Sequence, residues 1–151
     1  MADLTATRAA AGFPATLFAG AGVLNVAYGS YDVAAEPAAA STLAICKVPA
    51  GSVVLGGWIR AEDLDSDTSE TIDIDVGTVA DPDAFGNFGV QTGDAVTGYL
   101  PEGGVLLPLN GTLKDGPVSI SADTDIIVTF VDDPATFAAG TVTVVVFYVA
   151  A

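Results

Sequence analysis

The chain has 151 residues, of which 51% are hydrophobic, and 19 acidic residues against four basic ones give it a net charge of −15 at pH 7. It contains no histidine and a single cysteine, so the usual Ser-His-Asp and Cys-His arrangements of nucleophilic catalysis cannot be assembled. A surface this acidic repels phosphate groups, which argues against nucleic acids and anionic membranes as partners.

The first 22 residues are rich in Ala and Gly and contain few large apolar side chains. We expect residues 1–22 to form an extended arm that becomes ordered against a partner, with Arg8, Phe13 and Phe18 as contact residues. No basic segment followed by a long apolar run opens the chain, so we expect no signal peptide and synthesis in the cytoplasm. Residues 23–151 form the expected β-domain.

Short strands separated by turn signals follow the arm. A strand over 23–28 leads to a turn at Gly29-Ser30, with further strand as far as Val33. Residues 42–48 and 52–61 are expected to form a hairpin closed by Pro49-Ala50-Gly51. Within its second strand, Gly56-Gly57 predicts a β-bulge or a close backbone approach.

The clearest alternation in the chain covers residues 71–77. Ile72, Ile74 and Val76 share one face of a strand, and Thr71, Asp73 and Asp75 share the other. One buried and one solvated face is typical of an antiparallel sheet. Residues 80–104 then lack clear periodicity, and they form either a functional loop or a meander at the edge of a sheet.

The last third of the chain returns to strands, which we expect over 105–109, 118–122, 125–131 and 141–149. Pro108 favours an edge position for the first of them. The strand over 141–149 is apolar on both faces, so it is either central or meets a neighbouring subunit. About eight strands in all predict an all-β fold, an antiparallel β-sandwich of jelly-roll-like form.

An acidic segment at 62–70 is the densest candidate for a metal site. Asp63, Asp65 and Asp67 match the beginning of an EF-hand loop, but Thr68 replaces the required Gly and Ile74 occupies the twelfth position. A calcium site of another type therefore stays open as an alternative. We prefer a solvated acidic hairpin tip between two strands.

Asp81-Pro82-Asp83 has the residue types of a turn. The two carboxylates could also form the acid pair of a glycosidase, although nothing in the sequence sets their separation or raises a pKa. Phe85, Phe88 and Tyr99 are expected either to anchor this loop or to contact a partner. No glycine-rich phosphate loop is present, and we expect no cofactor.

Three segments in the middle of the chain resemble a recurrent pattern. They are Val48-Pro49-Ala50-Gly51-Ser52-Val53-Val54, Ile74-Asp75-Val76-Gly77 and Asp81-Pro82-Asp83-Ala84-Phe85. The pattern is similar to that of small structural proteins encoded in the head gene modules of tailed bacteriophages, and residues 126–130 and the final Val-rich strand also fit it. The resemblance covers roughly residues 43–149.

This resemblance implies a head decoration (cement) protein. Such a protein is a non-enzymatic β-sandwich on the outer surface of the virion, bound to the major capsid protein lattice and often trimeric. The resemblance brings no catalytic residues with it. From the residues themselves we predict as capsid or subunit contacts the side chains singled out above: Arg8, Phe13, Phe18, Phe85, Phe88 and Tyr99. Two alternatives remain, a phage tail or carbohydrate-binding receptor module, and an enzyme whose site consists only of carboxylates. The acidic excess either keeps the surface soluble or adapts it to a salty medium.

Overall fold

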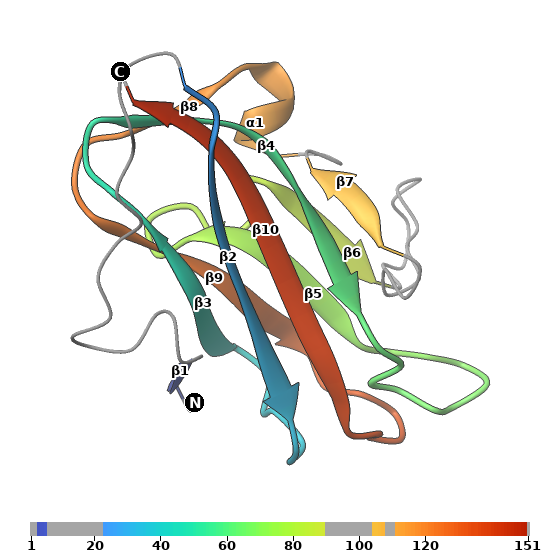
Figure 1. Ribbon diagram of the computed structural model, residues 1–151. Helices are drawn as coiled ribbons and strands as arrows, with labels where there is room; N and C mark the ends of the chain where they lie inside the picture. The colour runs from blue at the N-terminus through green and yellow to red at the C-terminus, as the bar shows by residue number, and fades with distance from the viewer. Residues whose placement is uncertain (1–2, 6–22, 90–103, 108–110, 151) are drawn as a thin grey trace.

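The computed structural model describes residues 3–5, 23–89, 104–107 and 111–150, in which ten strands form two β-sheets packed face to face (Figure 1). Sheet A has the strand order β1 (Asp3–Thr5), β3 (Ser41–Val48), β9 (Thr124–Asp132), β5 (Asp73–Thr78) and β6 (Gly86–Gly89). Sheet B has the order β2 (Asn25–Val33), β10 (Gly140–Ala150), β4 (Ser52–Ala61) and β7 (Val105–Leu107), and β8 (Val118–Ile120) also pairs with β4. A four-residue helix, α1 (Thr112–Asp115), precedes β8. No helix in the described residues is long and apolar enough to cross a membrane.

The strands pair as a nested set, which is the topology of a jelly roll. β2 pairs with β10, β3 with β9, β4 with β8, and β5 with β6, all antiparallel. The early strands therefore pair with the late ones, as in a long hairpin folded over into two sheets. The predicted antiparallel, jelly-roll-like β-sandwich is confirmed.

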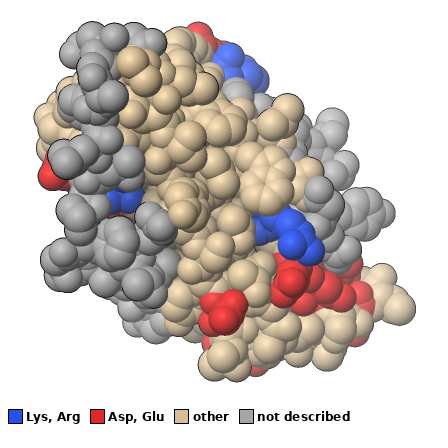
Figure 2. Space-filling model, in the orientation of Figure 1, with Lys and Arg blue, Asp and Glu red and all other residues tan. Residues whose placement is uncertain are grey.

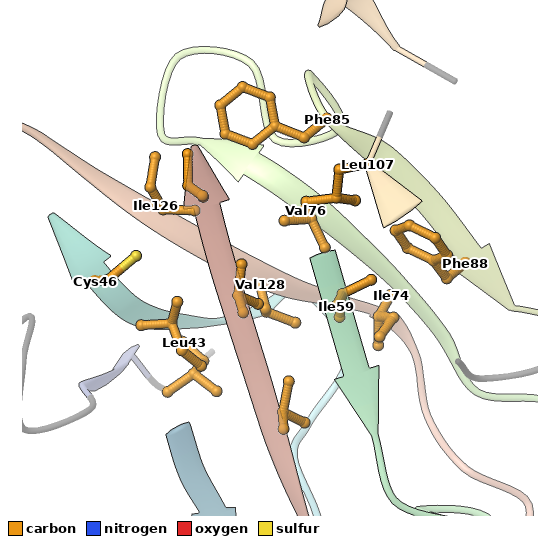
Figure 3. Packing of buried hydrophobic residues seen from close by; sticks show 14 of the residues in the cluster. Leu43, Cys46, Ile59, Ile74, Val76, Phe85, Phe88, Leu107, Ile126 and Val128 are labelled. Atoms are coloured by element: carbon orange, nitrogen blue, oxygen red, sulfur yellow. The ribbon is translucent and has the colours of Figure 1, made fainter. Parts of the chain in front are cut away.

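The core lies between the two sheets and is built from inward side chains that alternate regularly along β10 and less regularly along β3, β4, β5 and β9. In β10 the inward residues Val142, Val144, Val146 and Tyr148 are fully buried. The side chains that fill the core from both sheets are aliphatic and aromatic, and the single cysteine, Cys46, is buried among them (Figure 3). The sulfur of Cys46 thus serves as a small apolar group in the core.

The hairpin predicted around Pro49-Ala50-Gly51 is wrong. β3 belongs to sheet A and β4 to sheet B, so these three residues carry the chain from one sheet to the other. The acidic segment after β4 makes the same kind of crossing to β5. Turn residues mark where a strand ends, but the next pairing depends on partners far away in sequence: β9 for β3, and β10 for β4.

The turn predicted at Gly29-Ser30 is also wrong, because β2 runs without interruption from Asn25 to Val33. A side chain at Gly29 would collide with the backbone carbonyl oxygen of Ile45 in the opposite sheet. Glycine is therefore needed here for the close approach of β2 and β3, not for a reversal of the chain.

The irregularity predicted at Gly56-Gly57 is confirmed. The register of β4 against β10 shifts so that Gly56 lies opposite Phe147 and Val54 opposite Tyr148, which leaves Leu55 as the additional residue of a bulge. A Cβ atom at Gly57 would collide with the carbonyl oxygen of Val145 in the neighbouring strand. Both features named in the prediction are thus present.

The strand predicted over residues 71–77 forms as β5 (Asp73–Thr78), but only one of its faces matches the prediction. Ile72, Ile74 and Val76 are buried as expected. Of the predicted solvated face only Thr71 is exposed, because Asp73 is buried as well and Asp75 is half-buried. β5 lies inside sheet A, between β9 and β6. One edge strand of this sheet is therefore β6, which lies in the long segment after residue 80.

Three residues of the expected N-terminal arm belong to the sandwich. Asp3–Thr5 form β1, which pairs in parallel with Thr42, Leu43 and Ala44 of β3 in the same chain. The expectation that the whole arm becomes ordered only against a partner is therefore wrong for these residues. Residues 6–22 lie outside the described part of the chain, and the division at residue 22 stays a prediction.

Candidate assembly surface

The strand that is apolar on both faces, β10, lies at the centre of sheet B and carries no charged residue. Its outward side chains align with those of its neighbours. Tyr28 of β2 lies opposite Val145, Val145 lies opposite Trp58 of β4, and Trp58 lies opposite Leu106 of β7. An apolar row therefore crosses the full width of the sheet on its outer side.

A second set of apolar side chains lies beside this row. Val26 of β2 is opposite Phe147 of β10, and the bulged Leu55 of β4 follows on the other side of β10. We call the combined surface the apolar face: Val26, Tyr28, Leu55, Trp58, Leu106, Val145 and Phe147. In Figure 2, which views sheet B from outside, uncharged side chains fill the centre, and the visible charged groups lie mainly toward the margins.

The apolar face is accessible at both ends of its row. Tyr28 is 48% exposed and Leu106 is 71% exposed. Trp58, between them, is half-buried because the backbone at Gly104 packs against its indole: a Cβ atom there would lie 2.6 Å from Nε1 of Trp58. A contiguous apolar surface of this kind on a highly charged chain is typical of an interaction site.

Polar residues limit the apolar face at one end. The Ser30 and Thr143 hydroxyl groups form a hydrogen bond of 2.8 Å, and the Thr141 hydroxyl donates to Asp32 Oδ1 at 2.9 Å. Among the outward residues of β2, β10, β4 and β7 with a described side chain, only Asp32 and Arg60 are charged, with opposite signs. The face as a whole is therefore neutral.

The acidic segment after β4 is organised around Asp65, which is buried rather than solvated as predicted. Its carboxylate accepts hydrogen bonds from five backbone N–H groups, of Asp67, Thr71, Ile72, Ala135 and Thr136, at 2.8–3.3 Å. These donors come from two separate loops, one after β4 and one between β9 and β10. Asp65 thus joins both loops at one end of the sandwich.

This hydrogen bonding sets the ionisation of Asp65. Burial raises the pKa of the carboxyl group, but the backbone hydrogen bonds from Thr71, Thr136, Ala135 and Asp67 outweigh burial and lower the pKa to about 2. The negative charge is thereby compensated by amide dipoles of the chain itself.

The calcium alternative for Asp63, Asp65 and Asp67 finds no support in this geometry. Asp63 Oδ1 accepts the N–H of Asp65 at 3.0 Å, and Asp67 Oδ1 accepts the N–H of Ser69 at 2.8 Å. No group of three or more acidic, His or Cys side chains that could hold a metal ion occurs in the described residues. The carboxylates shape the loop instead, as in Asx turns.

The residues predicted as contacts divide into two groups. Phe85 and Phe88 are 0% and 1% exposed and belong to the core (Figure 3). They anchor the loop, which was one of the two predicted roles, and they offer no surface to a partner, so their prediction as contact residues is wrong. Arg8, Phe13, Phe18 and Tyr99 lie outside the described residues, and their roles stay predictions.

Asp81 and Asp83 form the predicted turn. The Thr78 N–H donates a hydrogen bond to the carbonyl oxygen of Asp81 at 2.9 Å, and the Phe85 N–H donates one to the carbonyl oxygen of Val76 at 2.8 Å. An open groove beside this turn is also lined by Asp123 and Asp125 of the β8–β9 region.

Each carboxylate of this groove has a partner. Asp81 accepts from the Thr112 hydroxyl at 2.7 Å, Asp123 from the Ala50 N–H at 2.9 Å, and Asp125 pairs with Lys47 at 3.1 Å. These contacts give each group a structural role. They do not assemble the free acid and base that a carboxylate enzyme needs.

One carboxyl group that the sequence did not single out has an altered pKa. Burial raises the pKa of Asp75 to about 6; the hydrogen bond from the Asn87 amide, at 2.6 Å, opposes this shift, and the charges of Asp73 and Asp83 add to it. Asp75 was assigned to a solvated strand face. Asp75 lies in an interior strand, opposite Asn87 of β6 on one side and Thr129 of β9 on the other. This interior position in sheet A is the feature that would have indicated its partial burial.

No family model and no curated protein matches the chain. Solved structures do. A chain in the capsid of Ralstonia phage GP4 is similar with a TM-score of 0.76 and 19% identity, over 99% of both chains. A chain in the capsid asymmetric unit of cyanophage Pam1 has a TM-score of 0.70 and 22% identity, over 91% of this chain and 92% of that one.

A third similar chain comes from the acid-stable capsid of Helicobacter pylori bacteriophage KHP30. Its TM-score is 0.55 at 10% identity, over 85% of this chain and 90% of that one. At such identities the likeness establishes the fold. The jelly roll described here is a fold found in the capsids of three bacteriophages.

Proposed function

We propose that this protein is a structural component of a bacteriophage virion that decorates the outer surface of the capsid, bound to the lattice of the major capsid protein as a homotrimer. The observation that carries this proposal is the fold similarity to a chain of a phage capsid over 99% of both chains. Because the similarity extends over the whole length of both chains, it concerns the entire sandwich and not a single motif within it.

The apolar face supports a role that depends on assembly. Fully burying a large apolar side chain contributes about 1.5–3 kcal/mol, and the face presents several partly exposed ones in register across sheet B. Association costs several kcal/mol in lost freedom of motion, so a contact of this size needs most of the face. A decoration protein requires such burial and requires no chemistry.

The charge supports an external position. The net charge of −15 would place carboxylates against packaged DNA if the protein lined the inside of a capsid. The repulsion between these groups and the phosphates would oppose packaging. On the outside the same charge keeps the particles apart in solution.

The test is reconstitution on heads that lack the protein. Purified full-length protein is added to heads assembled from the major capsid protein alone, and bound protein is measured by co-sedimentation. The proposal predicts saturable binding, with a fixed ratio to the major capsid protein. Binding to isolated tails or host cells, with none to heads, would instead support a tail or receptor-binding module and would contradict decoration.

A further inference from the structure

The large apolar side chains that remain exposed are not scattered. Among the described residues, Val23, Leu24, Val26, Tyr28, Leu55, Val79 and Leu106 are the exposed large hydrophobic residues. Only Val79 lies outside sheet B and the segment that enters it. Exposed apolar surface is thus concentrated on the apolar face and the beginning of β2.

From this concentration we infer that the apolar face packs against a second copy of the chain. The inference rests on the homotrimer of the proposed function and goes further by naming the surface that holds the copies together: the apolar faces lie around the trimer axis, where the face of each copy meets those of its neighbours. The core of the contact is the row of Tyr28, Val145, Trp58 and Leu106, in register across β2, β10, β4 and β7.

Charge identifies the occupant as another copy. Two copies of a chain with a net charge of −15 repel each other wherever acidic surface meets acidic surface. The outward residues of sheet B include one acid, Asp32, and one base, Arg60, near the same end of the face. A neutral, mainly apolar surface with one charge of each sign is the surface on which identical acidic molecules can meet.

The dimensions of the face set the size of such a contact. Three long strands, β2, β4 and β10, have nine to eleven residues. At a spacing of about 4.8 Å and a rise of about 3.3 Å for each residue they span roughly 14 Å by 30 Å, and the three residues of β7 add a short strip. This area, on the order of 500 Å² before side-chain relief is counted, lies below the roughly 800 Å² that each partner buries in a standard interface and is about half of the roughly 1,000 Å² that a specific interface buries in total. A contact between copies therefore needs the whole of each face.

The experiment measures self-association of the full-length protein by sedimentation velocity across a wide range of concentrations. The test variant is the double substitution Tyr28→Thr with Leu106→Thr, which truncates both ends of the row and keeps residues that suit strands. We expect the wild type to associate. The dissociation constant of the variant should be roughly a hundredfold higher, since two apolar contacts are lost for each copy. Circular dichroism and the melting temperature establish that the variant is folded.

The matched control is Val79→Thr, which removes an apolar side chain that is 76% exposed but lies away from sheet B. It should associate as the wild type does. If the wild type is monomeric throughout, or if the double variant associates as well as the control, the inference is overturned. Should the double variant misfold, Val26→Glu takes its place. This substitution puts a carboxylate of each copy into the contact, and the repulsion between these negative charges must also weaken association.

Head binding, measured on the same variants, separates this inference from the proposed function. A wild type that associates through this face but does not bind heads supports the inference and contradicts decoration. A monomeric wild type that binds heads supports decoration but overturns both this inference and the proposed homotrimer. A double variant that keeps its association but no longer binds heads assigns the face to the capsid shell and overturns the inference.

Discussion

A single buried carboxylate holds together one end of the sandwich. Asp65 accepts five backbone N–H groups from two loops that are about 70 residues apart in the chain, as the separation between Asp65 and Ala135 shows. A buried donor that loses its acceptor costs about 1–3 kcal/mol, and more when the acceptor is charged. The acidic segment is therefore a structural element.

We predict that Asp65→Ala lowers the free energy of unfolding by at least about 3 kcal/mol, because several buried amides lose their acceptor together. Urea unfolding at neutral pH measures the loss. Asp63→Ala is the control, since Asp63 accepts one N–H group at an exposed position, and it should cost less than about 1 kcal/mol. Equal losses in the two variants would contradict the role of Asp65.

The same pair of proteins has a defined pH dependence. The folded-state pKa of Asp65 is lowered from 3.8 to about 2, so its ionised form stabilises the fold above about pH 4. This contribution is lost as the pH falls from about 4 to about 2. The difference in stability between the wild type and Asp65→Ala should therefore shrink across that interval, and a constant difference would contradict the assignment.

Asp75 should show the opposite behaviour. Its folded-state pKa is raised from 3.8 to about 6, so protonation favours the folded state and stability falls as the pH rises from about 4 to about 6. Asp75→Asn keeps the oxygen that accepts from Asn87 and removes the charge. We expect this variant to be more stable than the wild type at pH 7 and above, by about 1–2 kcal/mol after discounting for partial exposure.

At a pH near 4 the gain from Asp75→Asn should vanish, because the wild-type side chain is then protonated as well. Thermal unfolding at the two pH values measures both points. A gain that is the same at both would show that the charge of Asp75 is not its cause.

At the scale of the strand, local sequence pattern located the elements better than it located their partners. The strands expected over 42–48, 52–61, 125–131 and 141–149 formed within about two residues of their predicted bounds. The hairpin at Pro49-Ala50-Gly51 did not form, because turn residues carry no information about which sheet receives the next strand. The nested pairs β2–β10 and β3–β9 join residues that no local window contains together.

Gly29 tests the close approach of the two sheets. We predict that Gly29→Ala lowers the free energy of unfolding by about 2 kcal/mol or more, because the added methyl group would meet the carbonyl oxygen of Ile45 and force the backbones apart. Ser30→Ala, at the next position but facing outward, should cost about 1 kcal/mol at most, through loss of its hydrogen bond to Thr143. Chemical denaturation compares the two, and a tolerated Gly29→Ala would contradict the close packing.

Deletion of residues 2–22 tests the role of the N-terminal arm. Of the described strands it removes only β1, and the nested pairs of the jelly roll remain. We expect the shortened protein to keep its β-sheet circular dichroism and to lose head binding. Unchanged head binding would contradict a role of the arm in attachment.

At the scale of the whole molecule, a chain with a net charge of −15 carries a neutral apolar face on the outer side of sheet B. The sequence predicted half of this arrangement, because β10 is apolar on both sides and was expected to be central or to meet a neighbouring subunit. It proved to be central, and its outer side is apolar and partly exposed. Tyr28, Trp58 and Leu106 could not be assigned to that face, because their alignment depends on the register of three other strands and on the bulge at Leu55.

Salt tests the balance between charge and burial in the whole molecule. Self-repulsion between copies with a net charge of −15 weakens as the Debye length falls from about 10 Å at 0.1 M to about 3 Å at 1 M ionic strength. The neutral contact is not screened, and burial of apolar surface does not weaken. We therefore expect sedimentation to show tighter self-association at high salt, whereas an association held by ion pairs would weaken.

A cryo-electron microscopy reconstruction of the intact phage particle that contains this protein locates the jelly roll directly. Decoration predicts the jelly roll at repeated positions on the outer surface of the head, in contact with the major capsid protein. Density for the sandwich only inside the shell, or only in the tail, would contradict the proposed function.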